Sequence, residues 1–145
     1  MTSKLAILTV MALMAAGVAR AEGYDPIETR QGGQALLSGT FAGIRAVVNA
    51  KGDVKTLENP AKAIQRWATS LPTLFPKGTE QGHNTKALAE IWSDQAGFQK
   101  ASMVLADAAG KLSEAAKAGD VDAVAGQVKA VGDACTACHR TYRAK

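Results

Sequence analysis

The last eleven residues of the chain contain two cysteines three positions apart, followed directly by a histidine, in the segment Cys135-Thr136-Ala137-Cys138-His139. This CxxCH spacing is typical of proteins that attach c-type haem covalently. In such a site the two thiols form thioether bonds to the haem vinyl groups, and the imidazole ligates the iron. The chain has only 2 cysteines and 2 histidines. The motif therefore predicts one covalent haem c attached through Cys135 and Cys138, with the iron axially ligated by His139.

Three other uses of this cysteine pair fit the sequence less well. A zinc site needs about four sulfur or nitrogen ligands, and the other histidine, His83, is far away in the sequence. A thioredoxin-like redox pair normally opens a helix after a strand, whereas this pair lies near the end of a long helical pattern. A disulfide between helix positions three apart would be strained and would close almost no loop.

The N-terminal residues have the organisation of a secretory signal peptide. Lys4 precedes an apolar run from Leu5 to Ala19, and Ala19-Arg20-Ala21 supplies a cleavage site of small residues. A membrane anchor is the alternative, but about 15 such residues are too few to span a bilayer comfortably. We therefore expect residues 1–21 to be removed on export. Residues 22–145 would remain as one periplasmic domain, with no membrane segment after cleavage.

The basic character of the chain comes partly from this leader. The net charge of the full chain is +4, with 17 basic and 13 acidic residues. Removal of Lys4 and Arg20 would leave 15 basic residues against 13 acidic ones, and two ionised haem propionates would bring the sum close to zero. The composition therefore gives no reason to expect nucleic acid as a partner.

Four segments of the remaining chain carry residues at alternating spacings of three and four, the spacing of one helix face. No segment carries a convincing strand pattern. We call the residues that share the inward face of one predicted helix a seam. The four predicted seams are Ile27, Arg30, Gln34, Leu37, Phe41, Ile44 and Val48; then Val54, Leu57, Ala61, Ile64, Ala68 and Leu71; then Phe98, Ala101, Leu105, Ala108, Leu112 and Ala115; and finally Val121, Val124, Val128, Val131, Cys135, Cys138 and Tyr142.

Start and stop signals bound these segments. Asp25-Pro26 opens the first, Pro72 ends the second, and the third starts near Ser93 or Asp94. Gly119-Asp120 leaves so short a connection that the last two helices must be antiparallel neighbours. The sequence therefore predicts an all-α, antiparallel four-helix bundle with covalently attached haem c, in which residues 72–92 form the one long connection.

The seams also indicate where the haem would lie. Cys135 and Cys138 occupy inward positions of the last helix, so the haem would enter the bundle interior. Arg30 and Gln34 interrupt the apolar seam of the first helix. Buried polar groups need partners, and haem propionates or an iron-bound ligand would supply them.

The chain resembles cytochrome c′, a family of class II c-type cytochromes, over essentially its whole length after residue 21. The similarity rests on five pieces in order, namely Arg30-Gln31 with Phe41, Leu71-Pro72, Phe75-Pro76-Lys77-Gly78-Thr79-Glu80, Glu90-Ile91-Trp92-Ser93-Asp94 with Phe98, and the CxxCH motif followed by Tyr142-Arg143. The resemblance implies an exported haem protein, often a homodimer packed through its first two helices. It implies that His139 is the proximal ligand with Arg143 beside it, and that Arg30, Gln31, Thr79 and Glu80 line the haem and its propionates.

Some positions keep two interpretations. The alternative for Gln31, Thr79 and Glu80 is that they are ordinary surface or loop-capping residues. Relatives place an apolar blocker or a ligating methionine where this chain has Gln34, and no methionine lies on the first helix after residue 21. Gly32 and Gly33 would allow either close approach of the backbone to haem or close packing against a partner helix or subunit.

These observations leave several functional hypotheses. The first is one-electron transfer with periplasmic redox partners, and the alternative is binding of nitric oxide or carbon monoxide on the open side of the haem, near Gln34. A peroxidase would need a distal acid–base residue, for which His83 is the sole candidate, so we predict a protein that is not an enzyme. A haem-free interaction bundle is the remaining possibility.

Overall fold

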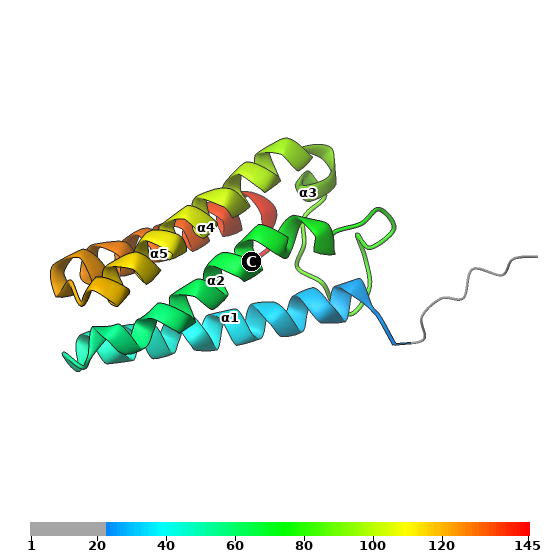
Figure 1. Cartoon of the computed structure of the whole chain (residues 1–145). Helices are drawn as coiled ribbons and strands as arrows, with labels where there is room; N and C mark the ends of the chain where they lie inside the picture. The colour runs from blue at the N-terminus through cyan, green and yellow to red at the C-terminus, as the bar shows by residue number, and fades with distance from the viewer. Residues whose placement is uncertain (1–22) are drawn as a thin grey trace, which may run out of the picture.

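A computed structural model describes residues 23–145 of the chain (Figure 1). The predicted signal peptide, residues 1–21, lies outside the described residues. Within 23–145, no helix combines the length and the apolar character that a membrane crossing requires.

Four long helices form the molecule. They are α1 (Pro26–Asn49), α2 (Glu58–Ser70), α4 (Gln95–Ala118) and α5 (Val121–Tyr142). Consecutive long helices run in opposite directions, so the start of α1, the connection from α2 to α4 and the end of α5 meet at one end of the bundle (Figure 1). The predicted all-α four-helix bundle is therefore confirmed, and residues 23–145 contain no strand beyond an isolated bridge between Ala87 and Arg143.

Local sequence accounts for the helix ends. Asp25 caps α1 by accepting hydrogen bonds from the backbone N–H groups of Ile27 and Glu28, and Asp94 and Asp120 cap α4 and α5 in the same way. Gly119 ends α4 with a φ of 76°, a left-handed conformation that glycine adopts without the steric cost of a β-carbon. These signals confirm the predicted starts of the first, third and fourth helices.

The second helix is shorter than its predicted seam. The seam begins in a 3₁₀ helix, η1 (Val54–Leu57), continues through α2 and ends in a second 3₁₀ helix, η2 (Leu71–Leu74). All six residues of the seam are nonetheless buried. The crossover, residues 75–94 between η2 and α4, contains an additional short helix, α3 (Glu90–Ser93), which the sequence did not predict.

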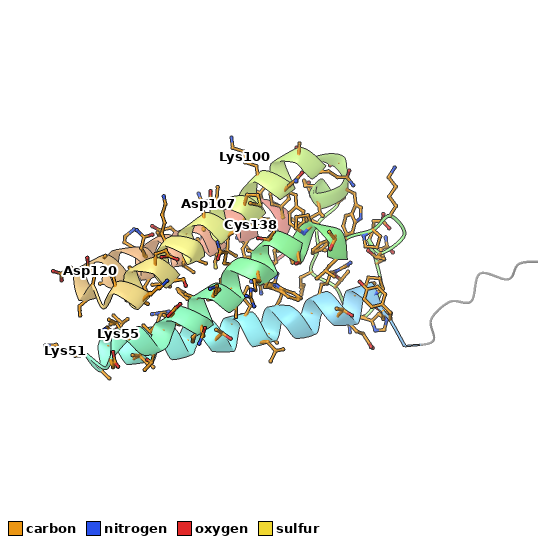
Figure 2. All side chains as sticks on the ribbon, in the orientation of Figure 1. Lys51, Lys55, Lys100, Asp107, Asp120 and Cys138 are labelled. Carbon is orange, nitrogen blue, oxygen red and sulfur yellow. The ribbon has the colours of Figure 1, made fainter. Side chains whose placement is uncertain are left out.

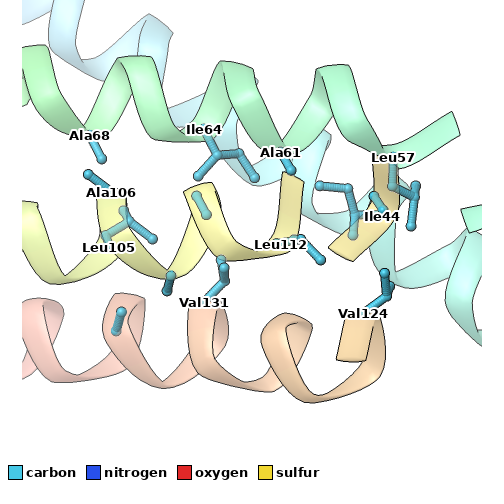
Figure 3. Close-up of a cluster of buried hydrophobic side chains, with 14 of the residues drawn as sticks. Ile44, Leu57, Ala61, Ile64, Ala68, Leu105, Ala106, Leu112, Val124 and Val131 are labelled. Carbon is cyan, nitrogen blue, oxygen red and sulfur yellow. The ribbon is translucent and has the colours of Figure 1, made fainter. Parts of the chain in front are cut away.

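The main core lies between α2, α4 and α5 (Figure 3). It contains many small side chains, which let these helices approach closely. Its buried members include Ala61, Ile64, Ala68, Leu105, Ala109, Leu112, Val124 and Val131. A second cluster at the crossover end is rich in aromatic residues and is built from Leu71, Ile91, Phe98 and Tyr142, with Trp67, Phe75 and Trp92 against it. α1 contributes Ile44 to the main cluster, with Leu37, Phe41, Val47 and Val48 packed against it.

Two details differ from the predicted seams. Val121 was expected to face the core, but it is 59% exposed, because it is the first residue of α5, at the end of the bundle. The buried stripe of α4 is wider than expected and includes Ser102 and Ser113. Their hydroxyls donate to the carbonyls of Ala68 and Glu58, so both buried polar groups are satisfied.

Gly33 is a close-packing position between α1 and α2. A β-carbon at residue 33 would collide with the indole ring of Trp67, whereas one at Gly32 would meet no atom within 4 Å. Of the two interpretations of this glycine pair, packing against a partner helix therefore holds for Gly33. The indole Nε1 of Trp67 is buried without a hydrogen-bond partner in the described part of the chain.

We predict that Gly33→Ala destabilises the protein, although alanine favours helices by about 1 kcal/mol over glycine. The added methyl group must displace the indole of Trp67, and overpacking of this kind typically costs about 1–3 kcal/mol. Urea unfolding of the purified protein, followed by circular dichroism, measures the change. Gly126→Ala is the matched control, because a β-carbon there meets no atom within 4 Å, and it should raise stability. Equal effects of the two substitutions would contradict this account.

Candidate haem site

A cavity of about 520 Å³ opens between α1, α5 and the crossover. Its size falls within the range of cofactor pockets. The two helices that form its longest walls hardly touch each other, because the cavity separates them. Cys138 lies toward the C-terminal end of α5, at the crossover end of the bundle (Figure 2).

The α5 wall carries the CxxCH motif. Cys135, Cys138 and His139 all line the cavity, since positions i, i+3 and i+4 share one face of a helix. Both thiols are half-buried, and this burial raises the pKa of each, with the neighbouring Cys135 adding to the effect at Cys138. His139 is more exposed, and desolvation together with the charge of Arg143 lowers its pKa. A neutral imidazole of this kind is the form that binds a metal.

The α1 wall faces this motif with mixed chemistry. Leu37 and Phe41 line the cavity together with the amide side chains of Gln31 and Gln34. Gln31 is exposed and donates from Nε2 to the carbonyl of His83 at 3.0 Å. Gln34 is half-buried, with no side-chain hydrogen bond recorded among the described residues. Its amide is therefore available to a group in the cavity.

Arg30 is the buried cation of the site, with only 2% of its surface exposed. Its guanidinium donates to the carbonyl of Leu74 at 3.2 Å and to Thr79 at both Oγ1 (2.8 Å) and the carbonyl (2.6 Å). It also lies over the ring of Phe75, with 4.5 Å between Cζ and the centroid. Desolvation lowers its pKa, but an arginine remains charged in proteins. All its hydrogen-bond acceptors are neutral, so the site holds a cation suited to an anionic ligand.

The crossover residues divide into two groups. Thr79 and Glu80, which the resemblance implied as haem-lining residues, do not line the cavity. Thr79 instead orients Arg30, and Glu80 accepts a hydrogen bond from the backbone of Gly78 at 3.1 Å. Lys86, Ala87 and Ile91 do line it, as do Arg45 on α1 and the aromatic residues Phe75, Phe98 and Tyr142. Nothing in their local sequence distinguished Lys86 and Arg45 from ordinary surface residues.

Tyr142 fixes the end of α5 against the start of α4. Its hydroxyl donates to Oδ2 of Asp94 at 3.0 Å, while Oδ1 of the same carboxylate caps α4 through the N–H of Gly97. Gly97 has to lack a side chain, because a β-carbon there would lie 2.6 Å from the tyrosine oxygen. The backbone of Leu88 donates to the carbonyl of Tyr142 at 3.1 Å. The cavity wall that carries His139 is therefore anchored one turn beyond the motif.

His83 lies away from this cavity. It lines a different depression on the crossover, and its imidazole lies 3.1 Å from Asp25 and 3.4 Å from Glu28, at the start of α1. Met103 is 39% exposed on α4 and does not line the cavity either. Across residues 23–145, no three His, Cys, Asp or Glu side chains gather into a group that could hold a metal ion.

Known proteins resemble this chain over most of its length. It matches the family described as Cytochrome C′ over residues 25–143. It is 33% identical to cytochrome c′ of Rubrivivax gelatinosus over 123 residues, which is 83% of this chain and 95% of that protein. It is 34% identical to cytochrome c′ of Rhodospirillum rubrum over 128 residues, 86% of this chain and 87% of that protein.

Solved structures of cytochrome c′ also superpose on this chain. The crystal structure of cytochrome c′ from Thermochromatium tepidum superposes with a TM-score of 0.77 at 30% identity, covering 84% of this chain and 98% of that one. A nitric oxide complex of a mutant cytochrome c′ from Alcaligenes xylosoxidans gives a TM-score of 0.75 at 32% identity, covering 83% of this chain and 94% of that one.

The four-helix bundle, with a cavity bordered by a CxxCH motif, is that of a haem-binding c-type cytochrome. Among such proteins, the chain belongs to the cytochrome c′ family.

We predict that Tyr142→Phe lowers the free energy of unfolding by about 1 kcal/mol, the typical net value of one hydrogen bond. The phenylalanine keeps the ring contact with Phe98, whose centroid lies 5.2 Å away, and loses only the bond to Asp94. Urea unfolding of the haem-loaded protein gives the value. Tyr24→Phe serves as the control, because Tyr24 is 59% exposed. If both variants unfold like the parent protein, the tyrosine hydroxyl does not stabilise the fold.

Proposed function

We propose that the protein is a periplasmic c-type cytochrome that carries a single covalent haem and acts in one-electron transfer. The main support for this proposal is that Cys135, Cys138 and His139 on α5 line the same cavity as apolar and cationic side chains of α1. When bound, haem supplies an iron that alternates between its ferric and ferrous states. The sequence pattern of residues 1–21 supports export to the periplasm.

Each residue of the α5 wall has a defined part in this proposal. Cys135 and Cys138 would hold the cofactor through two thioether bonds. His139 would ligate the iron in its neutral form, which the lowered pKa favours. Arg143 lies beside this imidazole, and its positive charge disfavours protonation there.

The α1 and crossover residues complete the site. Arg30 would supply a positive charge to a propionate, because the residue lines the cavity and the four protein acceptors of its guanidinium are all neutral. Thr79 positions Arg30, and Gln31 tethers the crossover through His83. Glu80 contributes its charge to Arg30 without lining the cavity.

A second proposal is the binding of nitric oxide or carbon monoxide on the α1 side of the iron. The amide of Gln34 lines the cavity on α1, opposite the α5 motif, and it can donate a hydrogen bond to a diatomic ligand. Mutant proteins of this family from Alcaligenes xylosoxidans have been solved with nitric oxide and with carbon monoxide. This role uses the same iron as electron transfer, so the two are compatible.

We do not propose an enzyme activity. Peroxide chemistry needs an acid–base residue beside the iron, and His83 lies outside the cavity, between Asp25 and Glu28. No nucleic-acid partner and no membrane attachment after export are proposed.

We also propose a homodimer through the outer face of α1. That face carries no charged residue between Arg30 and Arg45. Leu36 at its centre is 76% exposed, and β-carbons at Gly39 and Gly43 would meet nothing within 4 Å. An uncharged helix face with an exposed leucine is suited to contact with a second copy. Sedimentation velocity of the haem-loaded protein measures this association directly.

We predict that the double substitution Cys135→Ala with Cys138→Ala abolishes covalent haem, because no thiol remains for thioether formation. Intact-mass measurement and haem staining of the denatured exported protein test this. Thr136→Ala should retain haem, since this exposed residue lies between the cysteines and hydrogen-bonds only to the carbonyl of Gly132. An exported parent protein without added mass would eliminate the haem proposal altogether.

For the gas-binding proposal, we predict that Gln34→Leu raises the dissociation rate of carbon monoxide from the ferrous protein by about twofold to tenfold. This range corresponds to the loss of one neutral hydrogen bond, about 0.5–1.5 kcal/mol. Stopped-flow or flash-photolysis kinetics provide the rate. Ser38→Ala, one turn along the same wall, is the control. An unchanged rate in Gln34→Leu would mean that the amide does not contact the bound gas.

A further inference from the structure

The side chains that border the haem cavity carry charge of a single sign. Arg30, Arg45, Lys86 and Arg143 all line it, and no aspartate or glutamate does. Arg30 is buried inside, whereas the other three are exposed. We call Arg45, Lys86 and Arg143 the basic rim. Arg45 belongs to α1, Lys86 to the crossover, and Arg143 follows α5. Three separate segments of the chain therefore contribute to the basic rim.

The basic rim is not neutralised by neighbouring acidic side chains. The ion pairs found within residues 23–145 join His83 to Asp25 and Glu28, and Lys129 to Asp133. None of them includes a rim residue. Lys86 donates from Nζ to the backbone oxygen of Lys145 at 3.2 Å, which holds its side chain at the C-terminal end of the chain.

This charge is local and does not reflect the composition of the whole domain. Residues 23–145 contain 15 of the 17 basic residues and 12 of the 13 acidic ones, so the domain is nearly balanced. Two propionates of a bound haem would add two negative charges, and the positive charge of buried Arg30 would offset one of them. The opening therefore keeps an excess of exposed positive charge beside a low-dielectric cavity, an arrangement that focuses the electric field outward.

We infer that the mouth of the haem cavity is the docking surface for an electron-transfer protein with an acidic contact face. The inference deepens the proposed electron-transfer function and rests on it. Exposed rim charges of this kind act mainly on encounter, because they orient and attract a partner of opposite charge before contact. Docking here would bring a partner to the opening of the cavity that is proposed to hold the haem.

The arrangement fits a protein surface better than a small anion. A small anion is held by donors that converge on one point. The three rim cations are exposed and belong to separate segments, so each can meet a different carboxylate of a broad acidic face. Such contacts give specificity and speed of association more than affinity.

The test compares two charge-reversal variants of the haem-loaded protein. Arg45→Glu with Lys86→Glu removes two rim cations. Lys62→Glu with Lys111→Glu makes the same change in net charge at exposed positions on α2 and α4 that do not line the cavity. The probe is a fully reduced flavodoxin, a small acidic protein whose flavin gives up one electron as ferric iron becomes ferrous. Stopped-flow absorbance yields the second-order rate constant at ionic strengths from about 0.01 to 0.15 M.

We expect the rim variant to react about tenfold more slowly than the parent protein at the lowest ionic strength, with the difference shrinking as salt screens the charges. The control variant should differ from the parent by less than about twofold. Titration of the oxidised probe into the ferrous protein, followed by amide resonance shifts, should place the perturbed residues around the cavity mouth. This second readout reports contact without electron transfer.

Three results would overturn the inference. Equal slowing in both variants would mean that only net charge matters, and a salt-independent rate in the parent protein would exclude electrostatic docking. Inhibition by inorganic phosphate at constant ionic strength, present in the parent and lost in the rim variant, would assign the rim to a small anion instead. Absorption spectra recorded first separate these results from failure of the proposed function, in which the parent protein would itself lack haem.

Discussion

The buried guanidinium of Arg30 ties the crossover to α1, and the shape of the cavity depends on that connection. A cation removed from water is costly unless every N–H finds an acceptor. Here the carbonyls of Leu74 and Thr79 and the hydroxyls of Thr79 and Thr85 supply acceptors from residues 44 to 55 positions along the chain. Loss of the guanidinium would remove all of these bonds, and the bonds of Gln31 and His83 would remain between the crossover and the start of α1. Arg30 also lines the cavity. The same residue therefore stabilises the fold and adds a positive charge to the site.

The cavity exists because the four helices pack unevenly. Small side chains such as Ala61, Ala68 and Ala109 let α4 pack closely against α2, and α4 also packs extensively against α5, while α1 is held mainly at α2. The close packing of α5 on α4 gives the CxxCH motif a firm base, and the Tyr142–Asp94 hydrogen bond fixes the end of α5. Gln34 lines the cavity and is not part of the core, whereas Ile44 on the same helix is buried in it.

Much of the fold and part of the site followed from the sequence. Helix seams and aspartate caps are local signals, so the positions of α1, α4 and α5 were predicted closely. The exposure of Val121 was missed because a periodic pattern does not reveal where its partner helices end. The packing of Trp67 on Gly33 could not be inferred either, since the pattern left the role of that glycine open. Thr79 and Glu80 were expected at the cavity, yet the path of the crossover points them to Arg30 and Gly78 instead.

The sequence alone determined the chemistry at the C-terminus, because two thiols and an imidazole at this spacing share one helix face wherever that helix lies. It also determined the number of long helices, whose periodicity and caps involve residues only a few positions apart. Only the tertiary structure decided which polar groups face the cavity and which cations surround its mouth. Arg45, Lys86 and Arg143 are separated by dozens of residues, and only the path of the crossover brings them to one opening. Such contacts between distant segments leave no periodic trace in the chain.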